Sequence, residues 1–279
     1  MTSKTIAMLH PGEMGAAIGA GLVSRGHRVV WASAGRAAAT CRRAANCGLE
    51  DVETIARAAQ VANIVFSVCP PHAALELARA VAASGFGGVY VDANAIAAET
   101  TRAVGQAVGA AGASFVDAGI IGPPPLPGAS VRLYVCGSRA AEIAALFEGC
   151  VMQAIAIDAP VGAASALKVC YAAWNKGAIA LLAGIRALAQ QQGVDAALLS
   201  EWKISQPDIP KRSEVVTVSA RKAWRWIAEM EEIAASFEAA GLPAGFHLAA
   251  ADIYRRLEGF KDAAKAPTLA EVTAALSPR

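Results

Sequence analysis

Short apolar runs alternate with amphipathic segments over the first 160 residues of the chain. The runs resemble buried strands in length, and the segments between them carry apolar residues at helical spacing. This alternation predicts a parallel sheet with helices on both faces. The predicted strands are Lys4–Leu9, Arg28–Ala32, Asn63–Val68, Gly88–Asp92, Ser114–Ala118, Val131–Cys136 and Met152–Ile157, and the predicted helices include Ala16–Val23, Val52–Gln60, His72–Ala83, Ala97–Ala111 and Arg139–Glu148, with a short link at Leu49–Asp51.

The pattern changes after Pro160, where the strand signals end. Val161–Gln192 contains no proline, carries apolar residues at helical spacing, and is followed by Gly193, a typical helix terminator. At 1.5 Å per residue this helix would be about 45 Å long. The sequence thus predicts an α/β fold: a Rossmann-like, doubly wound dinucleotide-binding domain over residues 1–160, joined by the long helix to an all-helical substrate and dimerisation domain over residues 161–279.

Composition narrows the class of protein. Of 279 residues, 55% are hydrophobic and 17% charged, so a large core can form. The net charge of +2 comes from scattered basic residues, which argues against a nucleic-acid or membrane-surface partner. The six cysteines show no metal-ligand spacing, so we interpret them as buried thiols of a reducing compartment and expect no metal. With no charged leader and no long apolar span, we expect a cytoplasmic protein.

The first predicted strand leads into His10-Pro11-Gly12-Glu13-Met14-Gly15, and a helix follows. A strand, a glycine turn and a helix are the context of the dinucleotide fingerprint G-x-G-x-x-G, although His10 stands where its first glycine would be. Gly12 lets the backbone approach a pyrophosphate, and Gly15 lets the helix pack closely on the strand. We therefore predict cofactor binding at Gly12, Glu13, Met14 and Gly15; the alternative is an ordinary strand-to-helix turn.

The choice of cofactor can be predicted from the residues after the second strand. Folds that prefer NAD usually place an acidic residue there to bind the ribose 2′-OH. This chain has Ser33 and Arg36 instead, with no acid nearby until Glu50, and Arg42 or Arg43 could add positive charge. A hydroxyl and a guanidinium suit a 2′-phosphate, which predicts NADP(H) rather than NAD(H). The alternative is that the arginines form a solvated helix face.

Five segments in order resemble the β-hydroxyacid dehydrogenase superfamily, which includes the 6-phosphogluconate dehydrogenase-like and hydroxyisobutyrate dehydrogenase-like NAD(P)-dependent oxidoreductases. The resemblance covers most of the first 180 residues and is closest to a branch of small, poorly characterised members. The matching segments are Gly12–Gly15, the strand Asn63–Val68 with Cys69-Pro70, Asp92-Ala93-Asn94 with Glu99-Thr100, Asp117–Gly122, and Gly162–Lys168.

The resemblance implies roles for residues beyond the first turn. It places Cys69, Pro70 and Asn94 beside the nicotinamide cofactor and makes Lys168 the catalytic lysine. It also implies a substrate site formed by Ile120, Ile121, Gly122, Tyr171 and Trp174. The chain departs from the family pattern at Ile121, Pro123 and Ala172, where groups that hold a carboxylate-bearing substrate are missing. We therefore expect a more apolar or larger pocket than that of a simple small hydroxyacid.

The helical spacing around Lys168 supports a catalytic role for this residue independently of the family resemblance. Positions i, i+3 and i+7 share a helix face, so Lys168, Tyr171 and Asn175 would line up on an otherwise apolar helix, and we predict these three as the catalytic residues. A buried lysine can have its pKa lowered toward working pH, which suits a proton donor and acceptor. The alternative is a surface lysine. Lys176 lies about 80° further round the helix and is not expected to take part.

These patterns predict an NADP(H)-dependent oxidoreductase that interconverts a secondary alcohol or hydroxyacid and its carbonyl compound. Two alternatives stay open. One is an imine reductase on the same scaffold, for which Tyr171 could donate the proton, and the other is a non-catalytic NADP-binding sensor. We expect a small-molecule substrate and, because the family's helical domains pair across a two-fold axis, a homodimer.

Overall fold

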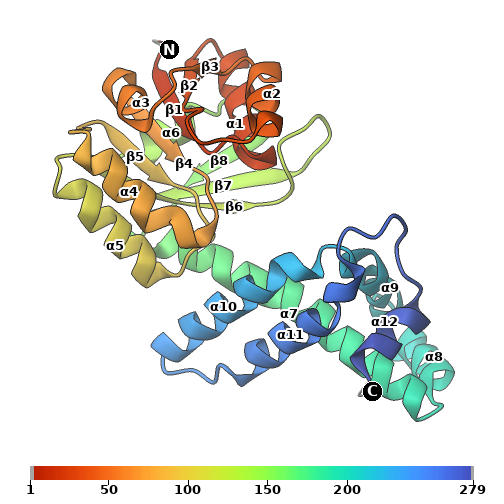
Figure 1. Ribbon diagram of the computed structural model, residues 1–279. Helices are drawn as coiled ribbons and strands as arrows, with labels where there is room; N and C mark the ends of the chain where they lie inside the picture. Colours follow the sequence, from red (N-terminus) through yellow and green to blue (C-terminus); the bar gives the residue numbers. More distant parts are fainter. Residues whose placement is uncertain (1–2, 278–279) are drawn as a thin grey trace. The chain divides into compact units, whose positions relative to one another are not determined.

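The computed structural model describes residues 3–277 of the chain. It divides into two compact units, residues 1–168 and residues 169–279 (Figure 1). The boundary predicted from the sequence, after residue 160, comes just before the long helix begins, whereas the division between the units lies inside that helix. No helix in the part of the chain that is described is long and apolar enough to cross a membrane.

The N-terminal unit is built on one eight-stranded sheet in the order β3-β2-β1-β4-β5-β6-β7-β8. β1 to β6 are parallel, as predicted, but β7 is antiparallel to β6. Only residues 122–130 connect β6 to β7, too short a segment for the crossover that a parallel pair needs, so the chain must turn back. The strands are β1 Thr5–Leu9, β2 Arg28–Trp31, β3 Glu50–Asp51, β4 Ile64–Ser67, β5 Val89–Asp92, β6 Ser114–Ile121, β7 Val131–Cys136 and β8 Met152–Ala156.

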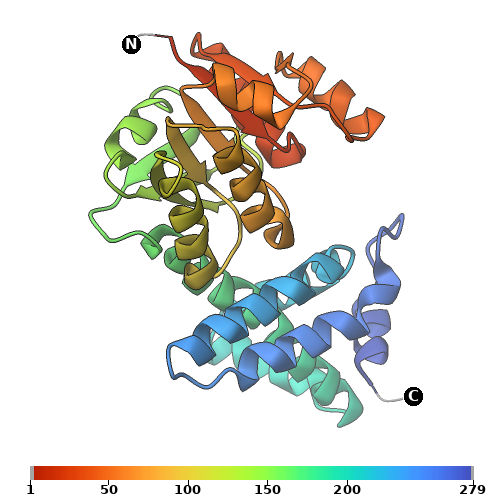
Figure 2. The same ribbon diagram turned by 60° about the vertical axis from the view of Figure 1, so that its left-hand side comes forward.

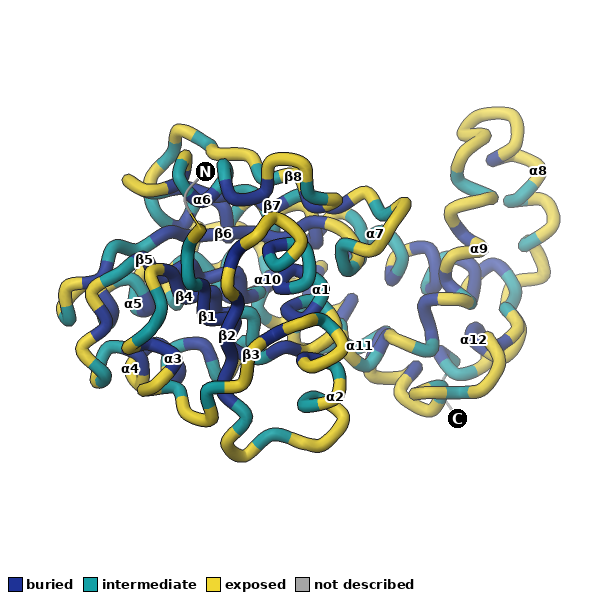
Figure 3. The backbone as a smooth tube through the Cα atoms, turned by 90° about the horizontal axis from the view of Figure 1, so that it is seen from above, coloured by how far each residue is buried: buried dark blue, intermediate teal, exposed yellow. Residues whose placement is uncertain are grey.

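Helices cover both faces of this sheet, as predicted. Alternate residues of β1 point to opposite faces: Ile6 and Met8 pack with α1, whereas Ala7 and Leu9 pack with α3 and α4. In Figure 2, α4 and α5 (gold and olive) lie side by side on the second face, and Figure 3 shows the strands as mostly buried. The helices are α1 Glu13–Ser24, α2 Ala38–Asn46 and α6 Ala140–Ala145 on one face, and α3 Ile55–Val61, α4 Ala74–Ala83 and α5 Ala98–Gly109 on the other.

The order of the strands determines where a ligand can bind. β1 lies between β2 and β4, so the chain leaves β1 in one direction and later returns to its other side. In open α/β sheets this reversal opens a crevice at the carboxyl ends of the two strands. The turns after β1 and β4, where several predicted cofactor residues lie, are at this point. β3 is a strand of two residues at the edge of the sheet, where the sequence predicted only a link.

The C-terminal unit is entirely helical among its described residues, in agreement with the prediction. The long helix α7 spans Ala163–Gln191, close to the predicted Val161–Gln192. Gly193 follows with φ of +68°, a left-handed conformation that favours glycine and ends the helix. The other helices are α8 Asp195–Ser205, α9 Ile209–Ala220, α10 Ile227–Ala239, α11 Gly245–Arg256 and α12 Leu269–Leu276.

Two ion pairs tie α7 to the rest of the helical unit. The buried Arg186 donates from Nε and Nη2 to the Asp195 carboxylate at 2.6 and 2.9 Å, and from Nη1 to Ser213 Oγ at 2.8 Å. These bonds join α7 to α8 and α9. Lys176 forms an ion pair with Glu229 of α10, so its ammonium group has a structural partner inside this unit.

Candidate active site

The turn between β1 and α1 is tightly constrained. His10 has φ of +65°, a left-handed conformation that is uncommon for a residue other than glycine. Gly12 N donates to His10 O at 2.8 Å, and a Cβ on Gly15 would lie 2.6 Å from that same oxygen. Gly15 must therefore be glycine for α1 to pack against the turn. Glu13 is exposed, whereas Met14 is half-buried and packs against the core.

The start of α1 is open to an anionic ligand. Gly12 is the N-cap residue, is exposed, and has no side chain to accept from the N–H groups of the first turn. A Cβ on Gly12 would meet no described atom within 4 Å, so the backbone faces open space. Helix N-termini with unsatisfied N–H groups favour negative charge. This geometry fits the pyrophosphate of a dinucleotide.

Two arginines lie over this turn. Arg36 Nη2 is 3.3 Å from His10 Nδ1, and Arg43 Nη1 donates to Pro11 O at 3.4 Å. The backbone N of Arg36 also donates to Ser33 O at 2.9 Å, which closes a turn after β2. The structure thus gathers the predicted residues Ser33 and Arg36 near the glycine turn and adds positive charge where phosphates would bind.

A buried polar network joins the ends of β4 and β5. Asn94 donates from Nδ2 to Ser67 Oγ at 2.8 Å and to Asp92 Oδ2 at 3.0 Å. Its Oδ1 accepts from Cys69 N at 2.6 Å, which ties the Cys69-Pro70 turn to β5. Cys69, Pro70 and Asn94, predicted separately, therefore lie together. The sequence did not predict Ser67 and Asp92 as site residues. A signal for them existed, because each is the last residue of its strand and the two are register partners.

Asp92 supplies the carboxyl group of this network, and its pKa is shifted by its surroundings. It is fully buried, and burial raises the pKa of its carboxyl group to about 6. Hydrogen bonds from Asn94 limit the rise, the charge of Asp117 adds to it, and the positive charge of Lys168 opposes it. Lys168 is therefore close enough for its charge to stabilise the ionised form of Asp92. Perturbed titratable groups of this kind cluster at functional sites.

A second buried carboxylate fixes the start of α7. Asp117 Oδ2 accepts from the backbone N atoms of Gly162 and Ala164, both at 2.9 Å, and of Ser165 at 3.2 Å. Its Oδ1 accepts from Ser165 Oγ at 2.5 Å. These are N–H groups that a helix start leaves without partners, and the helix dipole favours a negative charge there. Asp117, from the segment that resembles the family's substrate segment, thus anchors the helix that carries Lys168.

Gly119 of β6 sets the position of Lys168 relative to the sheet. A Cβ on Gly119 would lie 2.4 Å from Ala164 O and 3.3 Å from Lys168 Cβ. A larger residue would force the start of α7 away from β6. The half-buried Lys168 is therefore held against the carboxyl-terminal part of β6, beside the strand end that carries Asp92.

The residues predicted to bind substrate occupy different environments. Ile120 and Ile121 continue β6 and are 7% and 5% exposed, so they belong largely to the core. Gly122 begins the connection to β7 with φ of +125°, and a Cβ there would lie 2.6 Å from Ser130 O. The proline-rich loop after Gly122, rather than the two isoleucines, therefore has the exposed surface in this part of the chain.

The remaining predicted residues lie on α7 after Lys168. Tyr171 is 47% exposed and Trp174 is 61% exposed, with the Arg212 guanidinium 5.3 Å from the Trp174 ring centroid. Asn175 Nδ2 donates to Tyr171 O at 3.2 Å, which is a bond within the helix. Helical spacing gives Lys168, Tyr171 and Asn175 a common face.

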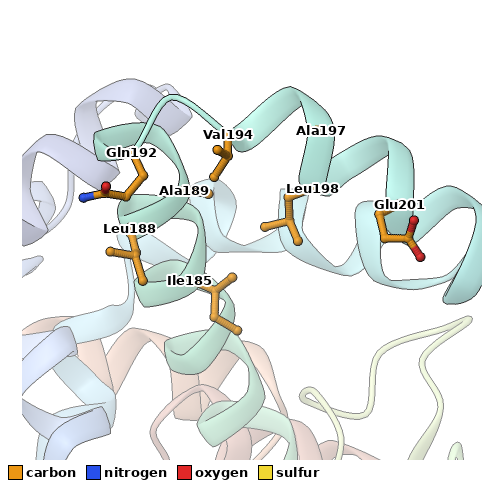
Figure 4. Close-up of a pocket in the computed structure, with 8 residues that line it drawn as sticks. All are labelled: Ile185, Leu188, Ala189, Gln192, Val194, Ala197, Leu198 and Glu201. Carbon is orange, nitrogen blue, oxygen red and sulfur yellow. The ribbon is translucent and has the colours of Figure 1, made fainter.

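An apolar stripe runs along α7 in the helical unit. Its members recur at alternating spacings of three and four residues, which keeps them on one helix face. A groove of about 520 Å³ lies beside the end of the stripe, where Ile185 and Leu188 of α7 approach Leu198 of α8 (Figure 4). A second hollow of about 400 Å³ includes Trp174 and Leu181. The stripe consists of Tyr171, Trp174, Ala178, Leu181, Ile185 and Leu188.

Comparisons with sequence families match both parts of the chain. The family described as the NAD binding domain of 6-phosphogluconate dehydrogenase matches residues 5–161, more than half of the chain. A family described as a domain of unknown function (DUF1932) matches residues 189–257. A search of curated proteins finds no match.

Solved structures share the fold over nearly the whole chain. A conserved hypothetical protein from Sinorhizobium meliloti has a TM-score of 0.79 at 25% identity, over 99% of this chain and 96% of its own. The Mycobacterium tuberculosis 3-hydroxyisobutyrate dehydrogenase with L-serine has a TM-score of 0.76 at 21% identity, over 99% and 100%. A Streptomyces aurantiacus imine reductase has a TM-score of 0.56 at 19% identity, over 99% and 100%.

The family match coincides with the glycine turn, the buried network of β4 and β5, and the sheet that carries them. The fold and the family together indicate a nicotinamide cofactor and oxidoreductase chemistry. The chain belongs to the family described as the NAD binding domain of 6-phosphogluconate dehydrogenase, in agreement with the resemblance to the β-hydroxyacid dehydrogenase superfamily seen in its sequence.

Proposed function

We propose that the protein is an NADP(H)-dependent oxidoreductase that interconverts a secondary alcohol or hydroxyacid and the corresponding carbonyl compound. The observation that carries the proposal is the position of Lys168. Asp117 and Gly119 hold the start of its helix against the carboxyl end of β6, and its charge acts on the buried Asp92. An amine at the edge where the dinucleotide fold binds its ligand can serve the reacting oxygen.

The residues near the glycine turn support NADP(H). The open N-terminus of α1 suits the pyrophosphate, and Arg36 and Arg43 supply positive charge beside it. Glu50, the first acid after β2, accepts from Arg28 Nε at 2.8 Å, so its carboxylate already has a partner. A guanidinium without a carboxylate at this position favours a 2′-phosphate over a free ribose hydroxyl. When bound, the nicotinamide group supplies or accepts the hydride.

The lysine would carry the proton of the reaction. In the reductive direction Lys168 Nζ donates a proton to the carbonyl oxygen while the carbonyl carbon receives the hydride, which gives the alcohol. In the oxidative direction neutral Nζ accepts the hydroxyl proton. The positive charge of Lys168 stabilises the ionised form of Asp92, so the two groups act on one another at the strand ends. Tyr171 and Asn175, on the same face of α7, would orient the substrate or the lysine.

One observation keeps imine reduction as the second candidate. Tyr171 is a largely exposed phenol about one turn after Lys168, and a phenol can donate a proton to an imine nitrogen. The solved imine reductase has this fold, which shows only that the scaffold can carry C=N chemistry. Lys168 favours the hydroxyl reaction, because Asp117 and Gly119 hold the lysine against β6 within the N-terminal unit.

The apolar stripe of α7 supports a homodimer. An exposed face with alternating spacings of three and four residues is the pattern by which one helix packs against another. Leu181 and Leu188, 47% and 59% exposed, belong to it, and a soluble monomer rarely leaves such a row uncovered. We propose that a second copy of the chain covers the stripe across a two-fold axis, so that the same residues of each copy form the interface.

The test is a screen of NADPH oxidation against ketoacids, ketones, aldehydes and imines, run with the parent protein, Lys168→Ala and Lys176→Ala. The proposal expects a carbonyl substrate whose turnover needs Lys168 but not Lys176. Turnover of imines only, with loss in Tyr171→Phe, would establish the second candidate instead. Binding of NADPH without turnover of any class would indicate a sensor.

A further inference from the structure

The histidine at position 10 has a conformational cost that a glycine would avoid. Among the described residues only His10, Glu53 and Asp262 combine a side chain with a positive φ. His10 directly follows β1, in the position that the dinucleotide fingerprint gives to a glycine. Strain of this kind persists where the surrounding structure imposes it, and it often accompanies a functional role. The side chain should therefore contribute something that glycine cannot.

The contribution is a contact with Arg36. The Arg36 Nη2 and His10 Nδ1 atoms are 3.3 Å apart, and a guanidinium can only donate. The imidazole must then accept at Nδ1 and carry its own proton on Nε2. Burial, and after it the charge of Arg36, lower the pKa of His10 to about 4, so the ring is neutral near pH 7 and keeps its acceptor.

A neutral acceptor differs from a carboxylate in its effect on the arginine. The Glu50 carboxylate holds Arg28, and Asp195 holds Arg186, so both guanidinium charges are matched within the protein. No carboxylate among the described residues forms an ion pair with Arg36. His10 thus restrains the direction of the guanidinium and leaves its charge for a ligand. Glycine at position 10 would give no such restraint.

We propose that His10 is a positioning residue that holds Arg36 over the β1–α1 turn to receive the 2′-phosphate of NADP(H), so that part of the cofactor preference is set at position 10. This inference rests on the proposed function. In this fold the turn after the first strand binds the pyrophosphate through its backbone. The inference gives the β1–α1 turn a second role, through the side chain of His10.

The experiment measures dissociation constants of NADPH and NADH by nicotinamide fluorescence, for the parent and for His10→Gly, His10→Asn and Arg36→Ala. His10→Gly should weaken NADPH binding about two- to tenfold, as the loss of one hydrogen bond would, and leave NADH binding unchanged. Its unfolding temperature should not fall, because glycine adopts the left-handed conformation freely. His10→Asn tolerates the same φ and offers an amide oxygen to Arg36, so it should retain part of the preference.

Two further variants make the result specific. In the Arg36→Ala background, His10→Gly should have no additional effect, because the group that it positions is gone. Arg42→Ala removes an exposed charge from α2, the helix that follows Arg36, and should lower the NADPH preference less than His10→Gly does.

The outcomes separate this inference from the proposed cofactor. A preference for NADPH that Arg36→Ala reduces and His10→Gly does not would overturn the positioning role and leave the cofactor proposal intact. A His10→Gly variant that weakens both cofactors equally would also overturn it, since the effect would then concern the turn alone. Equal parent affinities for the two cofactors would refute the NADP proposal and this inference together. A preference unaffected by Arg36→Ala would overturn this inference and leave NADP(H) as the cofactor.

Discussion

Two cations of the helical unit and two at the β1–α1 turn differ in the groups that they contact. In the helical unit, Arg186 and Lys176 are each matched by a carboxylate, Asp195 and Glu229, on a neighbouring helix. At the β1–α1 turn, the guanidiniums contact only an imidazole and a backbone carbonyl. A charge withdrawn from water must be compensated, either within the protein or by a ligand. Arg186 and Lys176 therefore join helices, whereas no described carboxylate pairs with Arg36 or Arg43, whose charges we propose to be matched by a bound anion.

The largest expected effect separates the two lysines of α7. Lys168→Ala should lower turnover about 10²–10⁴-fold, because it removes the general acid and base. NADPH affinity should hardly change, since we propose that the pyrophosphate binds at Gly12. Lys176→Ala is the matched control: it removes the same group from the same helix, and its ammonium is already paired with Glu229. Steady-state kinetics on the substrate found by the screen measures both.

Equal turnover of Lys168→Ala and the parent would remove this lysine from the mechanism. Tyr171→Phe would then be the next variant to measure, because the phenol is the other proton donor on that face. Tyr171→Phe and Asn175→Ala should otherwise give intermediate losses, as expected of groups that orient the substrate or the lysine.

The next effect concerns stability. Arg186→Ala leaves the Asp195 carboxylate, which is 22% exposed, without its partner and should cost about 1–3 kcal/mol of unfolding free energy. Arg36→Ala leaves no carboxylate unpaired and should cost less than about 1 kcal/mol. Urea unfolding followed by tryptophan fluorescence compares them. Equal losses would mean that Arg36 also has a mainly structural role.

A charge on the apolar stripe should weaken the dimer. Leu181→Glu places two like charges near each other across a two-fold interface, which should raise the dimer dissociation constant about a hundredfold. Leu248→Glu is the control, since Leu248 is similarly exposed, at 52%, but lies on α11 outside the stripe. Light scattering over a range of protein concentrations gives the result. A parent protein that is monomeric at micromolar concentration would contradict the proposed assembly.

The cofactor preference is expected to be smaller. NADPH should bind at least about tenfold more tightly than NADH, which is the contribution of one charge-assisted hydrogen bond. Arg36→Ala should remove most of this difference by weakening NADPH alone. Fluorescence titration of both cofactors measures this difference. In the control variant Arg186→Ala, the ratio of the NADH to the NADPH dissociation constant should stay at the parent value.

The smallest effect is a pH dependence of stability. Burial raises the folded-state pKa of Asp92 to about 6, above its unfolded value of 3.8, so the folded state binds more protons between these values. Stability from this group is therefore lost as pH rises from about 4 to 6, by at most about 3–5 °C of unfolding temperature per pH unit. Calorimetry should show the parent losing stability relative to Asp92→Asn over this window. A constant difference would mean that Asp92 titrates normally.

Local patterns predicted most of the fold. The strands up to β6 and the helices that cover them have strong periodicity, so their positions and layers followed from the sequence. The direction of β7 did not, because it depends on the length of a loop whose ends were uncertain: β6 extends to Ile121, three residues beyond its predicted end at Ala118. β3 has only two residues, Glu50 and Asp51, which is too short for any alternation to show.

The candidate site likewise contains features that the sequence could predict and contacts that it could not. The glycine turn and Arg36 carry signals in their own segments, and could be predicted. The contacts of Asp92 and Asp117 could not, because each depends on which strands and helices are neighbours. The sequence showed that His10 replaces a glycine, but not that its imidazole meets an arginine 26 residues further along the chain.

The carboxylate of Asp117 has a consequence for the angular phase of α7. By accepting from the N–H groups of Gly162, Ala164 and Ser165, it determines which residue is the first of the helix. Each residue advances a helix by about 100° and 1.5 Å, so a start displaced by one residue would rotate Lys168 through about a quarter of a turn. A single buried anion on β6 therefore sets the rotational register of the whole helix, and with it the direction in which the lysine emerges.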